Sequence, residues 1–332
     1  MSTVADYPHV HSAHCESGAV AGLVTHAGLP LSEAMAFGLS ATLCFAFLPF
    51  VKMGGCPLTS YRMPPGGVIK GLGKRLGLPL RFRKYKDEVA AMDDLDRALD
   101  AGRVVGCQTS VFWLPYFPEH MRFHFNAHNV VIFGREGDEY LISDPVFEDV
   151  VRCHRDDVRK ARFATGVFAP KGGTFTLDGA PGDLDLEAAV RGAVRLCARR
   201  MLQRVMPIVG VKGMERVARY VRALPGKHRD KPRRARLILG SIVRMQEEIG
   251  TGGAGVRFLQ ASFLQEAGQA LDDDTLRQAS EQMTAAGDEL RQFALLAVRA
   301  IKGEHDSFDE PAEQFVRAAH VEREAHRLLK RW

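Results

Sequence analysis

A segment rich in glycine and proline near the middle of the chain constrains the fold most, because it separates two stretches of different character. Residues 171–183 contain four glycines and one proline, which interrupt regular structure and mark turns or linkers. Before this segment, short apolar runs alternate with turn residues; after it, alanine, leucine, arginine and glutamate recur at helical spacing. At 332 residues the chain is long enough for two domains, and we place them at 1–178 and 179–332.

The spacing of apolar residues predicts an α+β domain followed by an all-α domain. In the first half, helical spacing gives way to strand-like runs, an order typical of helices beside an antiparallel sheet. The expected helices are 16–26, 32–46, 68–76 and 92–101, and the expected strands are 104–109, 129–133 and 140–143. In the second half we expect helices only, at about 184–206, 212–223, 233–250, 255–270, 273–302 and 309–331.

The cysteine pattern excludes two common kinds of site. No two of the six cysteines stand as Cys-x-x-Cys, so we expect neither a zinc ribbon nor a thioredoxin-type centre. The N-terminal residues lack the basic and apolar regions of an export signal, and no apolar run reaches the roughly 18 residues of a membrane helix. We therefore expect a cytoplasmic protein with reduced thiols, no integral membrane segment and no metal.

One cysteine, Cys15, stands where an irregular N-terminal segment meets the first expected helix. The positive end of the helix dipole and its unpaired N–H groups favour the thiolate, which is the reactive form of the side chain. The same N–H groups can stabilise an oxyanion on an attacked carbonyl. On its own this pattern is weak, because a cysteine at a helix start is more often a small buried apolar residue.

A partner for Cys15 is predicted from a hairpin later in the chain. His128 begins one apolar run and Asp144 closes the next. If Glu136 and Gly137 are the two turn residues, residue 128 faces residue 145, beside Asp144, within the roughly 4.5–5.5 Å that separates opposed side chains. An aspartate there can hold the imidazole N–H and fix its tautomer. Each residue alone has an ordinary structural explanation, but their order predicts a Cys15–His128–Asp144 triad.

Several segments in fixed order carry a resemblance to a known family. They are His14–Ala19, Leu31–Leu39, Leu114–Tyr116, His124–Val131 and Ser143–Pro145, with Glu248–Gly253 and Phe263–Ala267 in the second half. Their order is similar to the papain-like and C39-peptidase-like folds. More specifically, the chain resembles the family of the butirosin biosynthesis protein H N-terminal domain, followed by its usual helical partner domain.

The resemblance implies an acyltransferase that takes its acyl group from an acyl carrier protein. The namesake moves an amino-acyl group from such a carrier onto an aminoglycoside amine. By position, Cys15 would accept the acyl group from the thioester, His128 and Asp144 would assist, and a small-molecule amine or hydroxyl would receive it. The only cofactor implied is the phosphopantetheine that the carrier bears. Two departures from the pattern concern recognition and the oxyanion: Ser110 stands where members often have an acid, and His9 or His11 stands near the place of the papain-type glutamine.

The helical half is basic over one long stretch. Between Arg191 and Arg236 there are fifteen lysines and arginines against two acids. A solvated helix face is the usual explanation of such a run, but this density favours an anionic partner, and acyl carrier proteins are acidic. Nucleic acid fits the charge less well, because no nucleic-acid module is recognisable and few aromatic residues are interleaved. Apolar stripes in this half are also compatible with a homodimer.

Aromatic residues gather just before the histidine motif and have two interpretations. Trp113, Tyr116 and His124 can line an acyl pocket and bind substrate, or the run can belong to the core. Two other functions stay open beside acyl transfer. One is a cysteine peptidase or amidase on the same fold, and the other is a non-catalytic binding or scaffold protein that uses its helical domain.

Overall fold

The computed structural model describes residues 2–4, 6–180, 182–304 and 307–332, so Pro181 of the predicted linker lies outside them. The chain divides into two compact units. The sheet unit comprises residues 1–36 and 65–184, and the helical unit comprises residues 37–64 and 185–332. This division differs from the predicted domain ranges chiefly in residues 37–64, which come from the first half of the sequence and group with the helical unit.

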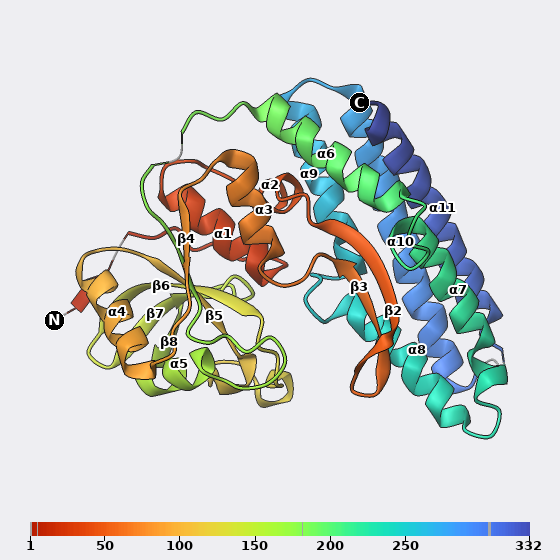
Figure 1. Cartoon of the computed structure of the whole chain (residues 1–332), viewed down its shortest axis with the longest axis horizontal. Coiled ribbons are helices and arrows are strands. Elements are labelled where there is room, and N and C mark those ends of the chain that lie inside the picture. Colours follow the sequence, from red (N-terminus) through yellow and green to blue (C-terminus); the bar gives the residue numbers. More distant parts are fainter. Residues whose placement is uncertain (1, 5, 181, 305–306) are drawn as a thin grey trace. The chain divides into compact units, whose positions relative to one another are not determined.

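A seven-stranded antiparallel sheet forms the centre of the sheet unit (Figure 1). Along it lie β4 (Leu80–Arg83), β9 (Thr174–Leu177), β5 (Val105–Thr109), β6 (His128–Glu136), β7 (Glu139–Ser143) and β8 (Val151–His154), with β1 (Ser2–Val4) also paired to β6. The expected antiparallel sheet is therefore confirmed, and its predicted strands are β5, β6 and β7. The others escaped prediction because they are three or four residues long and at least half polar.

Helices accompany this sheet and contribute to its core. They are α1 (Cys15–His26), α3 (Gly67–Leu76), α4 (Glu88–Asp100) and α5 (Arg155–Arg162). The apolar face of α4, with Met92, Leu95 and Leu99, packs in one cluster with Val130 and Ile132 of β6. Nine of the twelve residues of α1 are buried, so this helix is enclosed on nearly every side and its first residue is held in a fixed place.

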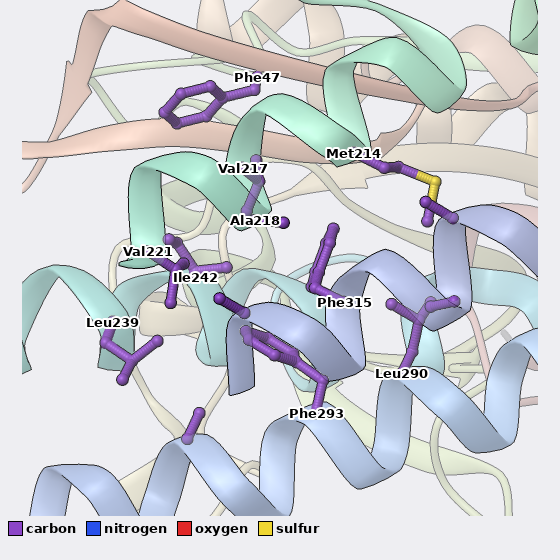
Figure 2. Packing of buried hydrophobic residues seen from close by; sticks show 14 of the residues in the cluster. Phe47, Met214, Val217, Ala218, Val221, Leu239, Ile242, Leu290, Phe293 and Phe315 are labelled. Atoms are coloured by element: carbon purple, nitrogen blue, oxygen red, sulfur yellow. The ribbon is translucent and has the colours of Figure 1, made fainter. Parts of the chain in front are cut away.

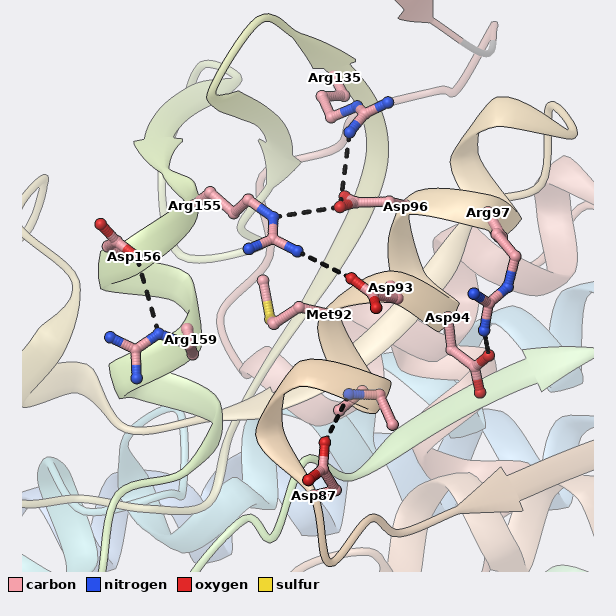
Figure 3. Close-up of polar contacts among 12 residues, drawn as sticks. Asp87, Met92, Asp93, Asp94, Asp96, Arg97, Arg135, Arg155, Asp156 and Arg159 are labelled. Atoms are coloured by element: carbon pink, nitrogen blue, oxygen red, sulfur yellow. Dashed lines mark hydrogen bonds and ion pairs between the residues drawn. The ribbon is translucent and has the colours of Figure 1, made fainter.

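Ion pairs fix the outer side of α4 (Figure 3). Asp96 receives Arg155 Nε at 3.1 Å and lies 3.4 Å from Arg135, while Arg155 also reaches Asp93 at 3.3 Å. Asp87 caps the helix by accepting from the N–H of Ala90 at 2.7 Å. Exposed pairs of this kind contribute about 0–1 kcal/mol each, so they orient the helix more than they stabilise it.

The helical unit consists of six long helices and a β-hairpin. The helices are α6 (Leu186–Leu202), α7 (Gly210–Lys227), α8 (Pro232–Glu247), α9 (Arg257–Ala270), α10 (Asp274–Lys302) and α11 (Asp309–Arg331), and the hairpin strands are β2 (Leu43–Met53) and β3 (Cys56–Arg62). Figure 2 shows the core, in which Phe47 of the hairpin, Val217 of α7, Phe293 of α10 and Phe315 of α11 belong to one buried cluster. The hairpin is thus part of the hydrophobic core of this unit.

The helix predicted at 32–46 is wrong in its second half. Helix α2 (Glu33–Leu39) ends early, Ala41 adopts a positive φ of 54°, and strand β2 begins at Leu43. The run Leu43–Val51 is apolar throughout, so its periodicity distinguishes poorly between a helix and a strand. Its aromatic residues Phe45 and Phe47 are buried in the core shared with α7 and α11, and that packing selects the strand.

Candidate active site

The first turn of α1 is fixed by a network of side chains around Cys15. His14, the N-cap residue, accepts from the N–H of Ser17, and its Nδ1 lies 2.8 Å from the Ser17 hydroxyl oxygen. The Glu33 carboxylate accepts from the N–H groups of Ala13 and His14 at 2.9 and 2.7 Å and from the Ser17 hydroxyl at 3.0 Å. Burial raises the pKa of Glu33, although these hydrogen bonds oppose the change.

Helix α1 is tied to its neighbour by a second buried carboxylate. Glu16 accepts from the N–H groups of Val68 and Ile69, at 2.7 and 3.2 Å, in the first turn of α3. These N–H groups have no acceptor inside their own helix, and α3 has the side-chain-less Gly66 as its N-cap residue. The residue after Cys15 therefore caps α3 from outside and helps to hold the cysteine in position.

His128 and Asp144 lie side by side. His128 Nε2 is 2.7 Å from Asp144 Oδ2, and both side chains are almost completely buried. Asp144 Oδ2 also accepts from the Tyr116 hydroxyl at 2.9 Å, and Asp144 Oδ1 accepts from the N–H of Val146 at 3.2 Å. With three donors facing it, the carboxylate is held in one orientation.

The register of the hairpin differs from the one predicted. Glu136 pairs with Glu139, so the turn residues are Gly137 and Asp138, not Glu136 and Gly137. Gly137 has a φ of 61°, and two-residue hairpin turns require positive φ at such positions. A bulge between Ile132 and Gly134 then shifts the pairing, so His128 reaches Asp144 through a register that the pattern of residues did not give.

Cys15 completes the group, because it lies near enough to His128 to raise the pKa of the imidazole. Because His128 Nε2 faces Asp144, Nδ1 is the ring nitrogen left for the thiol. Burial lowers the pKa of His128, but the charges of Asp144 and Cys15 and their hydrogen bonds outweigh it and raise the pKa from 6.5 to about 10. The imidazolium is therefore the favoured form of His128 in this site.

Close packing at Gly18 brings the two halves of the site together. The N–H of Ser12 donates to the carbonyl of Pro145 at 2.6 Å. A Cβ on Gly18 would lie 2.6 Å from the Cβ of Ser12 and 2.7 Å from that of Pro145, closer than real side chains approach. Glycine at this position thus lets the turn after Asp144 pack against the first turn of α1.

The three residues predicted to bind substrate lie in different surroundings. Tyr116 contacts the site through Asp144, while Phe117 packs edge-on against the His128 ring, 5.4 Å between centroids. Trp113 lines a separate pocket of about 450 Å³ with Phe112 and Lys160, and exposed His124 stacks on Phe112 at 4.0 Å. Within the described residues, neither Trp113 nor His124 makes a hydrogen bond or ring contact with Cys15, His128 or Asp144.

The segment that precedes Cys15 offers few donors for an oxyanion. His9 is engaged with the Ser143 hydroxyl at 2.8 Å and with the carbonyls of Phe147 and Glu148, and His11 is exposed. The N–H groups of Ala13 and His14 are taken by Glu33. The N–H of Cys15 itself lies outside the hydrogen-bond ladder of α1. It is therefore the donor best placed to stabilise an oxyanion.

Sequence reasoning missed the contact of Tyr116 with Asp144 and the contacts of Glu33. Both residues lie in motifs that carry the resemblance, so the sequence identified their positions but not their partners. Apart from its motif, Glu33 is an ordinary first-turn acid of α2. In the part of the chain that the structure describes, no group of three or more His, Cys, Asp or Glu side chains is arranged to hold a metal, and no helix is both long and apolar enough to cross a membrane.

Comparisons with known proteins agree with this arrangement. Residues 14–145 match the family model of butirosin biosynthesis protein H, N-terminal, a range that begins just before Cys15 and ends just after Asp144. Residues 156–329, more than half of the chain, match a domain of unknown function, DUF4872.

One solved structure shows a distant likeness. A crystal structure of a candidate C39-like peptidase from Bacillus anthracis is 15% identical, with a TM-score of 0.40 over 55% of this chain and 100% of that chain. No curated protein matches significantly. On the two family models, the chain belongs to the family in which a butirosin biosynthesis protein H N-terminal domain is followed by a DUF4872 domain.

Proposed function

We propose that this chain is an acyltransferase that takes an acyl group from the thioester of an acyl carrier protein, holds it on Cys15, and passes it to a small-molecule amine or hydroxyl. The contact of Cys15 with His128, at the start of a helix and beside a buried aspartate, carries the proposal. A nucleophile beside a base that an adjacent carboxylate orients is the arrangement that acyl transfer through a thiol requires. Membership of the family adds the carrier protein as the expected acyl donor.

In the first half-reaction the Cys15 thiolate attacks the carbonyl carbon of the thioester. A bond forms between Cys15 Sγ and this carbon, and the bond to the phosphopantetheine sulfur breaks. The departing thiolate takes the proton of the His128 imidazolium. Negative charge on the carbonyl oxygen builds up beside the N-terminus of α1, where the Cys15 N–H and the helix dipole stabilise it.

Acylation of Cys15 changes His128 from an acid into a base. The thiolate charge and its hydrogen bond are among the causes that raise the pKa of His128, and both disappear when the sulfur is acylated. The pKa of His128 therefore falls in the acyl-enzyme, so the imidazole can take a proton from the acceptor. The acceptor nitrogen or oxygen then bonds to the acyl carbon, and the bond to Cys15 Sγ breaks, which regenerates the thiolate–imidazolium pair.

Burial of the site favours transfer over hydrolysis. Cys15 is 6% exposed and His128 4% exposed, so little water reaches the acyl carbon in this arrangement. A site closed to water protects a reactive thioester intermediate. The acceptor must then be recognised well enough to enter, and its amine or hydroxyl supplies the second nucleophile.

Intact-protein mass spectrometry with an acyl-loaded carrier protein tests the proposal. Wild-type chain should gain one acyl mass, and Cys15→Ala should gain none. Cys153→Ala is the matched control, because Cys153 is buried in β8 and burial raises the pKa of its thiol to about 12; this variant should acylate like wild type.

Three outcomes would contradict the proposal. An adduct that persists in Cys15→Ala would remove the nucleophile. Turnover of a peptide without acylation by any carrier would point to a peptidase instead. A wild-type Cys15 that resists thiol alkylation at neutral pH would indicate a non-catalytic protein.

A further inference from the structure

The helical unit contains a large basic pocket that the acyl-transfer chemistry does not use. It has a volume of about 890 Å³ and is lined from the end of α6, the first turns of α7 and the last turns of α11. These three helices pack against one another within the helical unit (Figure 1). Its volume lies in the range of sites for small molecules and cofactors.

Positive charge converges on this basic pocket with little compensation. Its basic lining residues are Arg204, Lys212, Arg323, Arg327, Lys330 and Arg331, and Glu215 is its one acid. Glu215 already pairs with Arg323, and Arg327 pairs with Glu324. The other four cations have no carboxylate partner among the residues that the structure describes. Like charges that line one pocket repel one another, and a bound anion would reduce this repulsion.

The position of Lys212 makes an ordinary structural explanation insufficient. Lysines and arginines in the last turn of α11 are expected there, since they complement the negative end of the helix dipole. Lys212, however, lies in the first turn of α7, where the dipole disfavours a cation. That turn contains no acidic residue, and its N-cap residue, Val209, offers no side-chain acceptor. Lys212 is exposed, and an anion bound here would neutralise it and accept from the N–H groups of the helix start.

Apolar side chains form the rest of the wall. Met201, Leu202 and Val211 line the pocket beside the cations. Val205 and Met206, which follow the lining residue Arg204 in the chain, are 90% and 52% exposed. A ligand that matches this lining has a charged end and an apolar part.

We propose that the basic pocket binds a phosphorylated small molecule, a phosphate or diphosphate ester with an apolar portion. Phosphate oxygens accept several charge-assisted hydrogen bonds at once, which suits converging guanidinium and ammonium groups. A free coenzyme or nucleotide and the phosphopantetheine of a carrier protein share this chemistry. The proposal goes beyond acyl transfer, because it does not depend on Cys15.

Isothermal titration calorimetry on the full chain tests this proposal. The probes are pyrophosphate, adenosine diphosphate and phosphopantetheine. At least one probe should bind saturably, and pantetheine without phosphate should not. The double variant Lys212→Ala/Lys330→Ala should weaken binding at least about tenfold. The matched control Arg199→Ala/Lys302→Ala removes the same charge from exposed positions in α6 and α10 outside the pocket, and it should bind like wild type.

The results also distinguish the sources of the phosphate and separate the pocket proposal from the acyl-transfer proposal. If free phosphopantetheine and the loaded carrier protein both bind, and the pocket variant loses both, the pocket binds the phosphopantetheine of the carrier protein. If only adenosine diphosphate binds, the pocket binds a free nucleotide. Cys15→Ala should bind the probes normally, so a failed acyl transfer would leave this proposal standing. The pocket proposal would be overturned if both double variants weakened probe binding equally while their melting temperatures stayed unchanged. It would also be overturned if no probe bound saturably.

Discussion

The Tyr116 hydroxyl donates to Asp144 Oδ2 at 2.9 Å, and this is the same oxygen that faces His128 Nε2 at 2.7 Å. Burial and the Asp144 charge raise the pKa of Tyr116 well above its usual value, so the hydroxyl keeps its proton and remains a donor. We therefore expect Tyr116 to act as a positioning residue, since it holds the carboxylate that in turn holds the imidazole. The same tyrosine was predicted to bind substrate, and that role stays a prediction.

Replacing Tyr116 by phenylalanine tests its positioning role. Tyr116→Phe removes one charge-assisted hydrogen bond to Asp144, and we expect the acylation rate of Cys15 to fall about tenfold with little change in carrier-protein KM. Tyr140→Phe is the control, because Tyr140 donates to Asp96 at 2.6 Å, away from the triad. The rate is measured by mass spectrometry under single-turnover conditions. An equal loss in both variants would indicate a merely structural effect.

Asp144→Asn should preserve the shape of the site and remove the charge that favours the imidazolium. We expect the acylation rate to fall on the order of a thousandfold, since the amide can also stabilise the wrong tautomer. Cys15 should still react with an alkylating agent, because the variant leaves the nucleophile itself unchanged. A variant that acylates as fast as wild type would exclude Asp144 from the triad.

The pH dependence of stability provides an independent check on His128. Its folded pKa of about 10 lies above the unfolded value of 6.5, so its stabilising contribution is complete below pH 6.5 and is lost as pH rises through about 10. Wild type should thus lose stability between pH 7 and 10, measured as the free energy of unfolding in urea. Asp144→Asn should lose less over the same range. Parallel curves for the two proteins would show that Asp144 does not raise the pKa of His128.

Gly18→Ala tests the close approach of α1 to the turn at Pro145. The added methyl would lie 2.6–2.7 Å from Ser12 and Pro145, and relief of this clash should cost about 1–3 kcal/mol of unfolding free energy. It should also slow acylation, because the turn that carries Asp144 moves away from Cys15. Gly182→Ala, which meets nothing within 4 Å, is the matched control. Normal activity of Gly18→Ala would show that the site tolerates this displacement.

The buried pair Arg257–Glu322 should dominate the stability of the helical unit. Glu322 lies 2.7 Å from Arg257, both side chains are fully buried, and Arg257 also donates to the carbonyl of Tyr61. Glu322→Gln leaves the guanidinium uncompensated, which should cost about 3–5 kcal/mol. Glu324→Gln, on the surface of the same helix, should cost under about 1 kcal/mol. Circular dichroism during thermal unfolding compares the two, and equal melting temperatures would contradict the expected role of the pair.

The sequence by itself determined the α+β class of the first half, the helices of the second half and the order Cys15, His128, Asp144. These features depend on local patterns: an apolar spacing, a turn glycine, a cysteine at a helix start. The family could be inferred for the same reason, because its motifs are short runs of neighbouring residues that keep their order along the chain.

Only the tertiary structure decided which side chains meet. The bulge before Gly134 sets the hairpin register, the core shared with α7 and α11 makes Leu43–Met53 a strand, and the missing side chain of Gly18 brings Pro145 to α1. Tyr116 and Glu33 take their places through contacts with residues 28 and about 20 positions away. Alternative registers and alternative elements differ in free energy through the packing of side chains that are distant in sequence. No local pattern of residues contains that information.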